Sequence, residues 1–131
     1  MIYTVNFADL LLEMDIILLS EEPDPELDYA DIRLFAEYTD IRSQMAVTGE
    51  AVSRFAKDIE RLFSENYRYE PVTDVRAELT DGRQYIRFEH DSAIDVRFSA
   101  KLIQNGTEAE FEKDIPTLSI EQLTDALDIY R

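Results

Sequence analysis

The sequence predicts an α+β protein built on an antiparallel sheet of about six to seven strands, arranged as a meander. One helix is expected between the N-terminal and C-terminal strand groups, and a second, C-terminal helix packs on one face. Three observations predict this class: residues 32–47 alternate between apolar and polar, residues 52–63 follow a helical period, and two glycine-containing turns interrupt later alternating segments. At 131 residues, a single α+β domain covering 1–131 is expected.

The N-terminal residues are less regular. Residues 1–12 are apolar and fit either a short helix or an edge strand. Ile16 to Leu19 form a continuous aliphatic run, which is typical of a strand buried on both faces. The acidic segment 21–31 contains Pro23 and Pro25, so we expect an exposed loop there.

Alternation in residues 32–47 predicts a hairpin with one apolar face. We place a two-residue turn at Thr39-Asp40, although this pair is a weaker turn signal than Asn-Gly. The turn gives the cross-strand pairs Leu34–Met45, Ile32–Val47 and Glu37–Arg42.

The period then changes from 2 to 3.6, which predicts an amphipathic helix. Its apolar stripe consists of Val52, Phe55, Ala56, Ile59, Leu62 and Phe63. Thr48 is the expected N-cap, and Glu50 lies in the first turn, where the helix dipole favours an anion. The helix is expected to end near Asn66, before Pro71.

Two hairpins are predicted next, with turns at Asp81-Gly82 and Asn105-Gly106. The first turn gives the pairs Val75–Phe88, Ala77–Ile86 and Leu79–Gln84. The second gives the pairs Ala100–Phe111 and Leu102–Ala109 on the apolar face and Lys101–Glu110 on the polar face.

The C-terminal segment contains a capping-box pattern at residues 119–122, with Leu118 and Leu123 placed as a hydrophobic staple. Ile120, Leu123, Leu127 and Tyr130 then predict a short amphipathic helix.

Composition limits the function. The chain has 29 acidic and 13 basic residues, a net charge of −16, so its surface repels nucleic acid and anionic lipid and favours a basic partner or simply solubility. There is no cysteine, which excludes disulfides and thiolate metal sites. Neither a signal peptide nor an apolar membrane-spanning segment is found, so we expect a cytoplasmic protein that does not bind membranes.

No catalytic, cofactor-binding or metal-binding residue is predicted. The three glycines are all explained by turns or caps, so no glycine-rich loop is left to hold a phosphate. His90 is the single histidine and lies between Glu89 and Asp91, where we expect a solvated loop residue. With 29 acids, no particular pair of carboxylates can be selected for general acid–base catalysis.

The acidic segment contains the candidate binding residues. They are Glu21, Glu22, Asp24, Glu26, Asp28 and Asp31. They could surround a hard cation such as Ca²⁺, but the glycine and terminal glutamate of an EF-hand are missing, so a solvated loop is favoured. We predict that these carboxylates contact a basic protein partner.

The stretch EYTDIRSQMAVTGEAVSRFAKDIERL, residues 37–62, resembles the bacterial family typified by the WapI immunity protein. The similarity continues through the hairpin at residues 105–112 and the C-terminal helix, and covers roughly residues 15–131. Members of this family are partners of a wall-associated, contact-dependent toxin with tRNase activity. The resemblance implies a protein that neutralises a toxin, and it carries no assigned functional residues.

The leading hypothesis is therefore a non-enzymatic, immunity-type protein that binds and neutralises a cognate, secreted toxin domain. The first alternative is a protein-protein interaction or self-associating structural module, which would use an exposed sheet face or edge. The second alternative is a small-ligand binder or an enzyme, which would need a deep pocket with convergent polar groups. The sequence leaves the oligomeric state open, with a dimer as one alternative.

Overall fold

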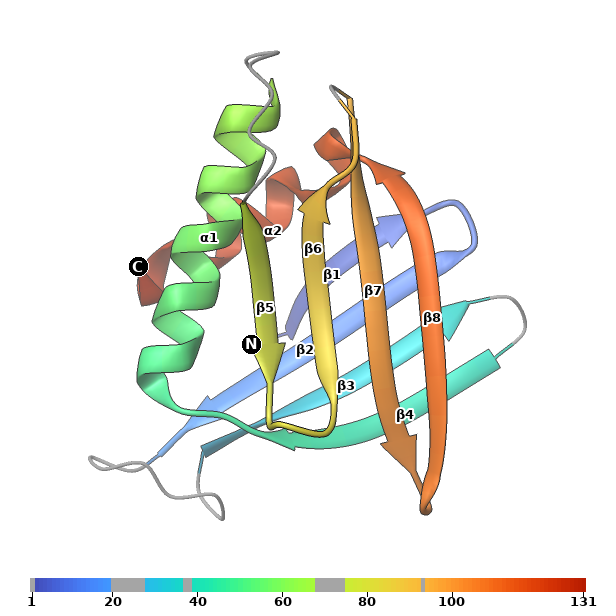
Figure 1. The fold of residues 1–131 in the computed structure, drawn as a ribbon. Coiled ribbons are helices and arrows are strands. Elements are labelled where there is room, and N and C mark those ends of the chain that lie inside the picture. Colours follow the sequence, from blue (N-terminus) through green and yellow to red (C-terminus); the bar gives the residue numbers. More distant parts are fainter. Residues whose placement is uncertain (1, 20–27, 37–38, 68–74, 93) are drawn as a thin grey trace.

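A computed structural model of the chain describes residues 2–19, 28–36, 39–67, 75–92 and 94–131 (Figure 1). The described strands form two four-stranded antiparallel sheets, each in sequence order. The first sheet contains β1 (Ile2–Phe7), β2 (Leu10–Leu18), β3 (Asp28–Ala36) and β4 (Thr39–Ala46). The second contains β5 (Arg76–Thr80), β6 (Tyr85–His90), β7 (Asp95–Gln104) and β8 (Thr107–Pro116). Helix α1 (Gly49–Tyr67) lies between them in the chain.

The prediction of one sheet with six to seven strands is therefore wrong, whereas the α+β class and the antiparallel pairing are confirmed. The two sheets lie in separate layers and their strands cross (Figure 1). Each sheet has one apolar face, and packing these two faces together buries both of them in one core. A single continuous sheet would need another element to cover the whole of its apolar face.

Residues 1–12 were ambiguous, and the structure assigns β1 and the start of β2 to them. Ala8, in the turn between the two strands, has a φ of 53°. Strand β2 alternates: Leu12, Met14 and Ile16 are buried, while Leu19 just beyond the strand is 71% exposed. The prediction of a strand buried on both faces at 16–19 is wrong, because only one face of the first sheet meets the second sheet.

The hairpin of β3 and β4 forms with a different register. Leu34 pairs with Ile41 instead of Met45, a difference of four positions, and Ala36 pairs with Thr39. Asp40 thus lies within β4 rather than in a turn. An even shift keeps every apolar residue on its predicted face, so periodicity alone could not distinguish the two registers. The predicted Glu37–Arg42 pair involves a residue outside those described.

In the second sheet, the turn at Asn105-Gly106 is confirmed. Both residues have positive φ, 52° and 79°, and the predicted pairs follow. The Asp81-Gly82 hairpin instead has a four-residue loop, so Leu79 pairs with Ile86. The Asp81 side chain explains the longer loop, because Oδ1 accepts hydrogen bonds from the N–H groups of Arg83 (2.9 Å) and Gln84 (2.7 Å).

Helix α1 confirms the predicted helix. The Thr48 hydroxyl accepts a hydrogen bond from the Ala51 N–H at 3.0 Å, as expected for an N-cap. The helix lies along the β5 side of the two sheets (Figure 1). A row of phenylalanines crosses the core from the helix to the opposite edge. The ring centroids are 6.4 Å apart for Phe55–Phe88, 5.1 Å for Phe88–Phe98 and 6.0 Å for Phe98–Phe111.

The C-terminal segment forms a 3₁₀ turn η1 (Thr117–Ile120), helix α2 (Glu121–Ala126) and a second 3₁₀ turn η2 (Leu127–Tyr130), which contact α1 and β1. The predicted capping box is wrong: Ile120 takes the N-cap position, and no side chain caps α2. The staple is also absent, since Leu118 is 59% exposed. Ser119 already belongs to the turn η1, so it does not occupy the position before α2 that a capping box requires. Among the described residues, no helix combines the length and apolar character needed to cross a membrane.

The C-terminal turn is held to β1 by two tyrosines. The Tyr3 hydroxyl donates a hydrogen bond to the Tyr130 hydroxyl at 3.0 Å, and their rings meet edge to face. Burial raises the pKa of Tyr3 well above its usual value, and the Tyr130 hydroxyl adds to this effect. The neutral phenol is therefore the form that the fold accepts.

This contact predicts a loss of stability at alkaline pH. A raised folded-state pKa gives stability that is complete below the unfolded pKa of about 10 and is lost as the pH rises above it. We expect the free energy of unfolding to fall above that pH, and to fall less steeply in Tyr3→Phe. Urea titrations at increasing pH measure this, with Tyr85→Phe on the second sheet as the control. An equal effect of the two variants would contradict it.

Candidate functional site

A groove of about 490 Å³ lies on the face of the first sheet that points away from the second sheet. It is lined by residues of all four strands: Ile2, Glu13, Asp15, Asp31, Ile32, Arg33, Arg42, Ser43 and Gln44. We call this surface the first-sheet groove. It is open rather than enclosed, and most of its lining side chains are charged or polar.

The groove residues come together through strand pairing. Glu13, Arg33 and Arg42 are direct neighbours in one row across β2, β3 and β4. In the next row, Asp15 is adjacent to Asp31, and Asp31 to Gln44. Because alternate residues of a strand share a face, two acidic positions on β2 reach the same surface as Asp31. The groove therefore holds three carboxylates beside two guanidinium groups.

The two arginines have different environments. Arg33 forms a two-pronged ion pair with Asp40, with Nε–Oδ1 and Nη2–Oδ2 distances of 3.1 Å each. This hydrogen bonding lowers the pKa of Asp40 and raises that of Arg33. Within the described part of the chain, no carboxylate forms an ion pair with the Arg42 guanidinium. Among the described groove residues, Arg42 is therefore a cation that is available to a partner.

Apolar side chains stand beside these charges. Phe35 on β3 is 43% exposed and Ile2 on β1 is 57% exposed. Phe35 lies in the row next to Arg33, beside the half-buried Leu11. The face thus combines a charged centre with exposed apolar groups at its margin.

The six predicted acidic residues are placed as follows. Glu21, Glu22, Asp24 and Glu26 lie outside the described residues. Asp28 is 3% exposed, and its Oδ1 accepts a hydrogen bond from the Leu19 N–H at 2.9 Å, so its side chain serves the fold. Asp31 is exposed and lines the first-sheet groove.

Sequence analysis missed Glu13 and Asp15, which accompany Asp31 in the groove. A signal was present in residues 10–18, LLLEMDIIL, where the acids occupy alternate positions and therefore one face of a strand. The aliphatic residues on both sides of the two acids favoured the interpretation of a strand buried on both faces, in which no polar face is expected.

A second, smaller crevice of about 180 Å³ lies between the sheets, where β8 passes the ends of β3 and β4. It is lined by Leu34, Ala36, Thr39, Ile41, Ala109, Glu110 and Phe111. Strand β8 is the edge of the second sheet on the side away from α1 (Figure 1).

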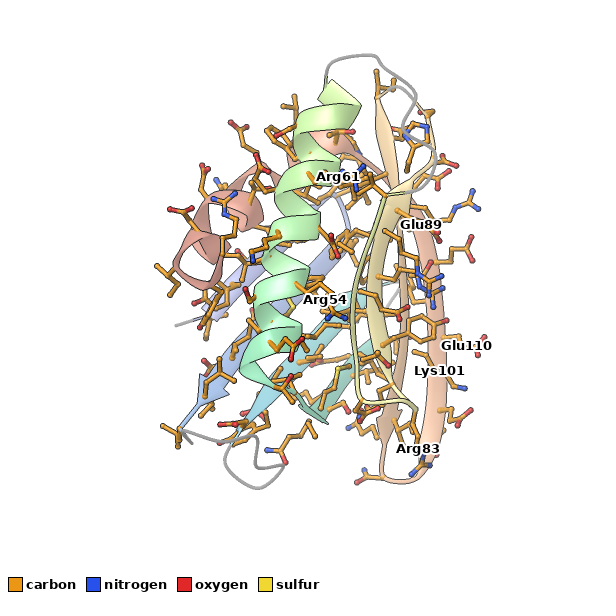
Figure 2. All side chains as sticks on the ribbon, turned by 60° about the vertical axis from the view of Figure 1, so that its left-hand side comes forward. Arg54, Arg61, Arg83, Glu89, Lys101 and Glu110 are labelled. Atoms are coloured by element: carbon orange, nitrogen blue, oxygen red, sulfur yellow. The ribbon has the colours of Figure 1, made fainter. Side chains whose placement is uncertain are left out.

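The outer face of the second sheet carries charged side chains, including Glu89, Lys101 and Glu110, which point away from α1 (Figure 2). Arg97 forms ion pairs with Asp114 (3.1 Å), Asp91 (3.2 Å) and Glu112 (3.3 Å). Its hydrogen bond lowers the pKa of Asp114, whereas burial and the adjacent Asp114 carboxyl raise the pKa of Asp91.

His90 is the last residue of β6, opposite Val96, and is half-buried. The prediction of a loop residue is therefore wrong, because strand β6 extends to this position. In the ranges that the structure describes, no three His, Cys, Asp or Glu side chains are grouped so that they could hold a metal ion.

Comparison with known protein families finds no matching family model, and comparison with curated proteins finds no significant relative. The resemblance to immunity proteins thus stays a prediction.

Proposed function

We propose that this protein is a non-enzymatic binding protein of immunity type, which neutralises a basic protein partner by covering it with the first-sheet groove. The observation that supports this proposal most directly is the convergence of Glu13, Asp15 and Asp31 on one open, exposed face.

The chemistry of the groove suits a protein partner. Protein interfaces commonly combine apolar contact area with arginine and polar groups. Here Phe35 and Ile2 provide the apolar contacts, and Arg42 is a cation of the type often found at interaction hot spots. An open groove covers another surface more readily than it encloses a small molecule.

Electrostatics favours a basic partner. A net charge of −16 attracts a positively charged protein from a distance and accelerates association. A toxin that cleaves RNA presents cations to the phosphates of its substrate. The three carboxylates of the groove would form ion pairs with such cations and thereby exclude the nucleic acid.

The test uses the domain encoded by the neighbouring gene, purified or expressed together with this chain. We expect the chain to bind that domain and protect cells from it. The double variant Glu13→Lys/Asp31→Lys should weaken binding by about tenfold or more, mainly through slower association, because it reverses charges that face the partner. Binding by the wild type should also weaken between ~0.05 and ~0.5 M salt, because screening lengths shorten over this range.

Asp125→Lys, on the exposed side of α2, changes the charge in the same sense at a residue that does not line the groove. The double variant Asp125→Lys/Asp128→Lys is the matched control for the two groove substitutions. If this control weakens binding as much as the groove variant, overall charge and not the groove is responsible. Absence of both binding and protection would contradict the proposed function.

A further inference from the structure

We propose that the outer edge of β8, which no other described strand pairs with, accepts an extended segment of a partner protein in which apolar and basic residues alternate. The segment would extend the second sheet by one strand. This inference does not rest on the first-sheet groove, because β8 belongs to the other sheet.

The backbone of β8 provides the first argument. Gln104 and Thr107 flank the two-residue turn, so they exchange both hydrogen bonds, and the following pairs alternate between bonded and non-bonded. Ala109 and Phe111 therefore bond to β7. Glu108, Glu110 and Glu112 direct their N–H and C=O groups away from β7, towards the free edge. Three alternate residues thus offer main-chain donors and acceptors to an added strand.

The side chains on the inner face of β8 provide the second argument. Side chains opposite Ala109 and Phe111 on an added strand would share their face and point into the crevice against β3 and β4. Leu34, Ala36 and Ile41, which line that crevice, are buried apolar residues. Its volume of about 180 Å³ is several times the roughly 30 Å³ that one water molecule occupies, so an aliphatic side chain has room there.

The outer face selects the charge of the segment. Glu108, Glu110, Glu112 and Asp114 alternate along β8 on this face. Lys101 is 3.5 Å from Glu108, and Arg97 is shared between Glu112 and Asp114. Among the described residues, Glu110 has no ion pair. Residues of an added strand opposite these carboxylates would be lysine or arginine.

The same charges disfavour a second copy of this chain as the occupant. Antiparallel pairing of two β8 edges would bring glutamates against glutamates, and like charges directly opposite each other destabilise a strand pair. The accessible part of the edge is also limited. Near the end of β8, the Lys113 Nζ is 2.7 Å from Asp9 Oδ1 and lies over the Phe7 ring, so the β1–β2 turn covers that part.

The test uses a labelled synthetic peptide, acetyl-(Lys-Val)₄-amide, with the full-length protein. In an antiparallel pair, the residues opposite Glu108, Glu110 and Glu112 would donate and accept the main-chain hydrogen bonds. In this peptide those residues are the lysines. Methylation of the lysine backbone nitrogens should therefore abolish binding, and methylation of the valine nitrogens should leave it nearly unchanged. The peptide (Glu-Val)₄ should not bind.

Glu110→Lys should weaken binding of (Lys-Val)₄ by about tenfold, while Asp125→Lys, at an exposed residue of α2 that lines neither surface, should bind like the wild type. Bound peptide should also slow hydrogen exchange of the Glu108, Glu110 and Glu112 amides. Equal binding of the two methylated peptides would show attraction by charge alone and overturn the proposal. No binding of (Lys-Val)₄ would overturn it as well, and would leave the first-sheet groove as the surface to test.

Discussion

Phe88→Ala is expected to lower the free energy of unfolding by about 3–5 kcal/mol. Phe88 is fully buried at the centre of the phenylalanine row, between Phe55 of α1 and Phe98 of β7. Truncation removes its apolar contacts and leaves a cavity between the helix and the second sheet, which close-packed neighbours fill only in part. Urea unfolding followed by circular dichroism measures the loss.

Phe35→Ala is the matched control, with the same change of side chain at a position that is 43% exposed. A loss within about 1 kcal/mol is expected there, since exposed substitutions usually have small effects. Similar losses for the two variants would show that the row does not hold the helix to the sheet.

Gln84→Leu is expected to lower the free energy of unfolding by roughly 2–4 kcal/mol. Gln84 is 6% exposed and joins the two sheets. Its Oε1 accepts hydrogen bonds from the Ser43 hydroxyl and from the Ile103 N–H, the latter at 2.9 Å. Its Nε2 donates to the Gln44 carbonyl at 2.9 Å and to Asp81 Oδ2 at 3.1 Å. The substitution leaves the half-buried Ser43 hydroxyl and Ile103 N–H without this partner, each at a cost of about 1–3 kcal/mol.

Gln104→Leu is the control for this prediction. Gln104 is exposed and also bridges the sheets, but through one hydrogen bond, in which its Oε1 accepts from the Arg42 N–H at 3.3 Å. Its replacement should cost no more than about 1 kcal/mol, because solvent can satisfy the groups that lose a partner. Chemical denaturation of both variants at one pH makes the comparison. A larger loss for Gln104→Leu would contradict the assignment of Gln84 as the main polar link.

The Gln84→Glu variant adds a pH dependence with a definite sign. A carboxylate at this position would face Asp81, which stays ionised because hydrogen bonds from Gln84 and Arg83 outweigh burial and lower its pKa. The pKa of the new glutamate would therefore be raised in the folded state. The free energy of unfolding of the variant should fall furthest below that of the wild type above this raised pKa. The difference should shrink as the pH falls through it. A penalty independent of pH would contradict this.

Local signals in the sequence predicted the elements that local chemistry determines. Asn105-Gly106 set a register because both residues accept positive φ, and the stripe of α1 identified its buried face. At Thr39-Asp40 and Asp81-Gly82 the predicted pairs were shifted by an even number of positions. Such shifts preserve the apolar face, so the pattern could not reveal them.

The division into two sheets could not be predicted in the same way. Alternation identifies which face of a strand is apolar, but it does not identify what that face packs against. The crevice beside β8 depends on this packing, because it brings Leu34 and Ile41 next to residues 109–111. Asp31 was selected from its acidic surroundings, and Glu13 and Asp15 joined it only through strand register.

In both sheets, strands adjacent in space are also adjacent along the chain. Each pair of neighbouring strands can therefore form outward from the segment that connects them. Closing long loops then costs little conformational entropy. The slower event in folding is the later packing of the two sheets against each other, which is stabilised by burial of their apolar faces and by the hydrogen bonds of Gln84 to β4. The order of the strands thus separates a fast, local stage of folding from a slower docking stage.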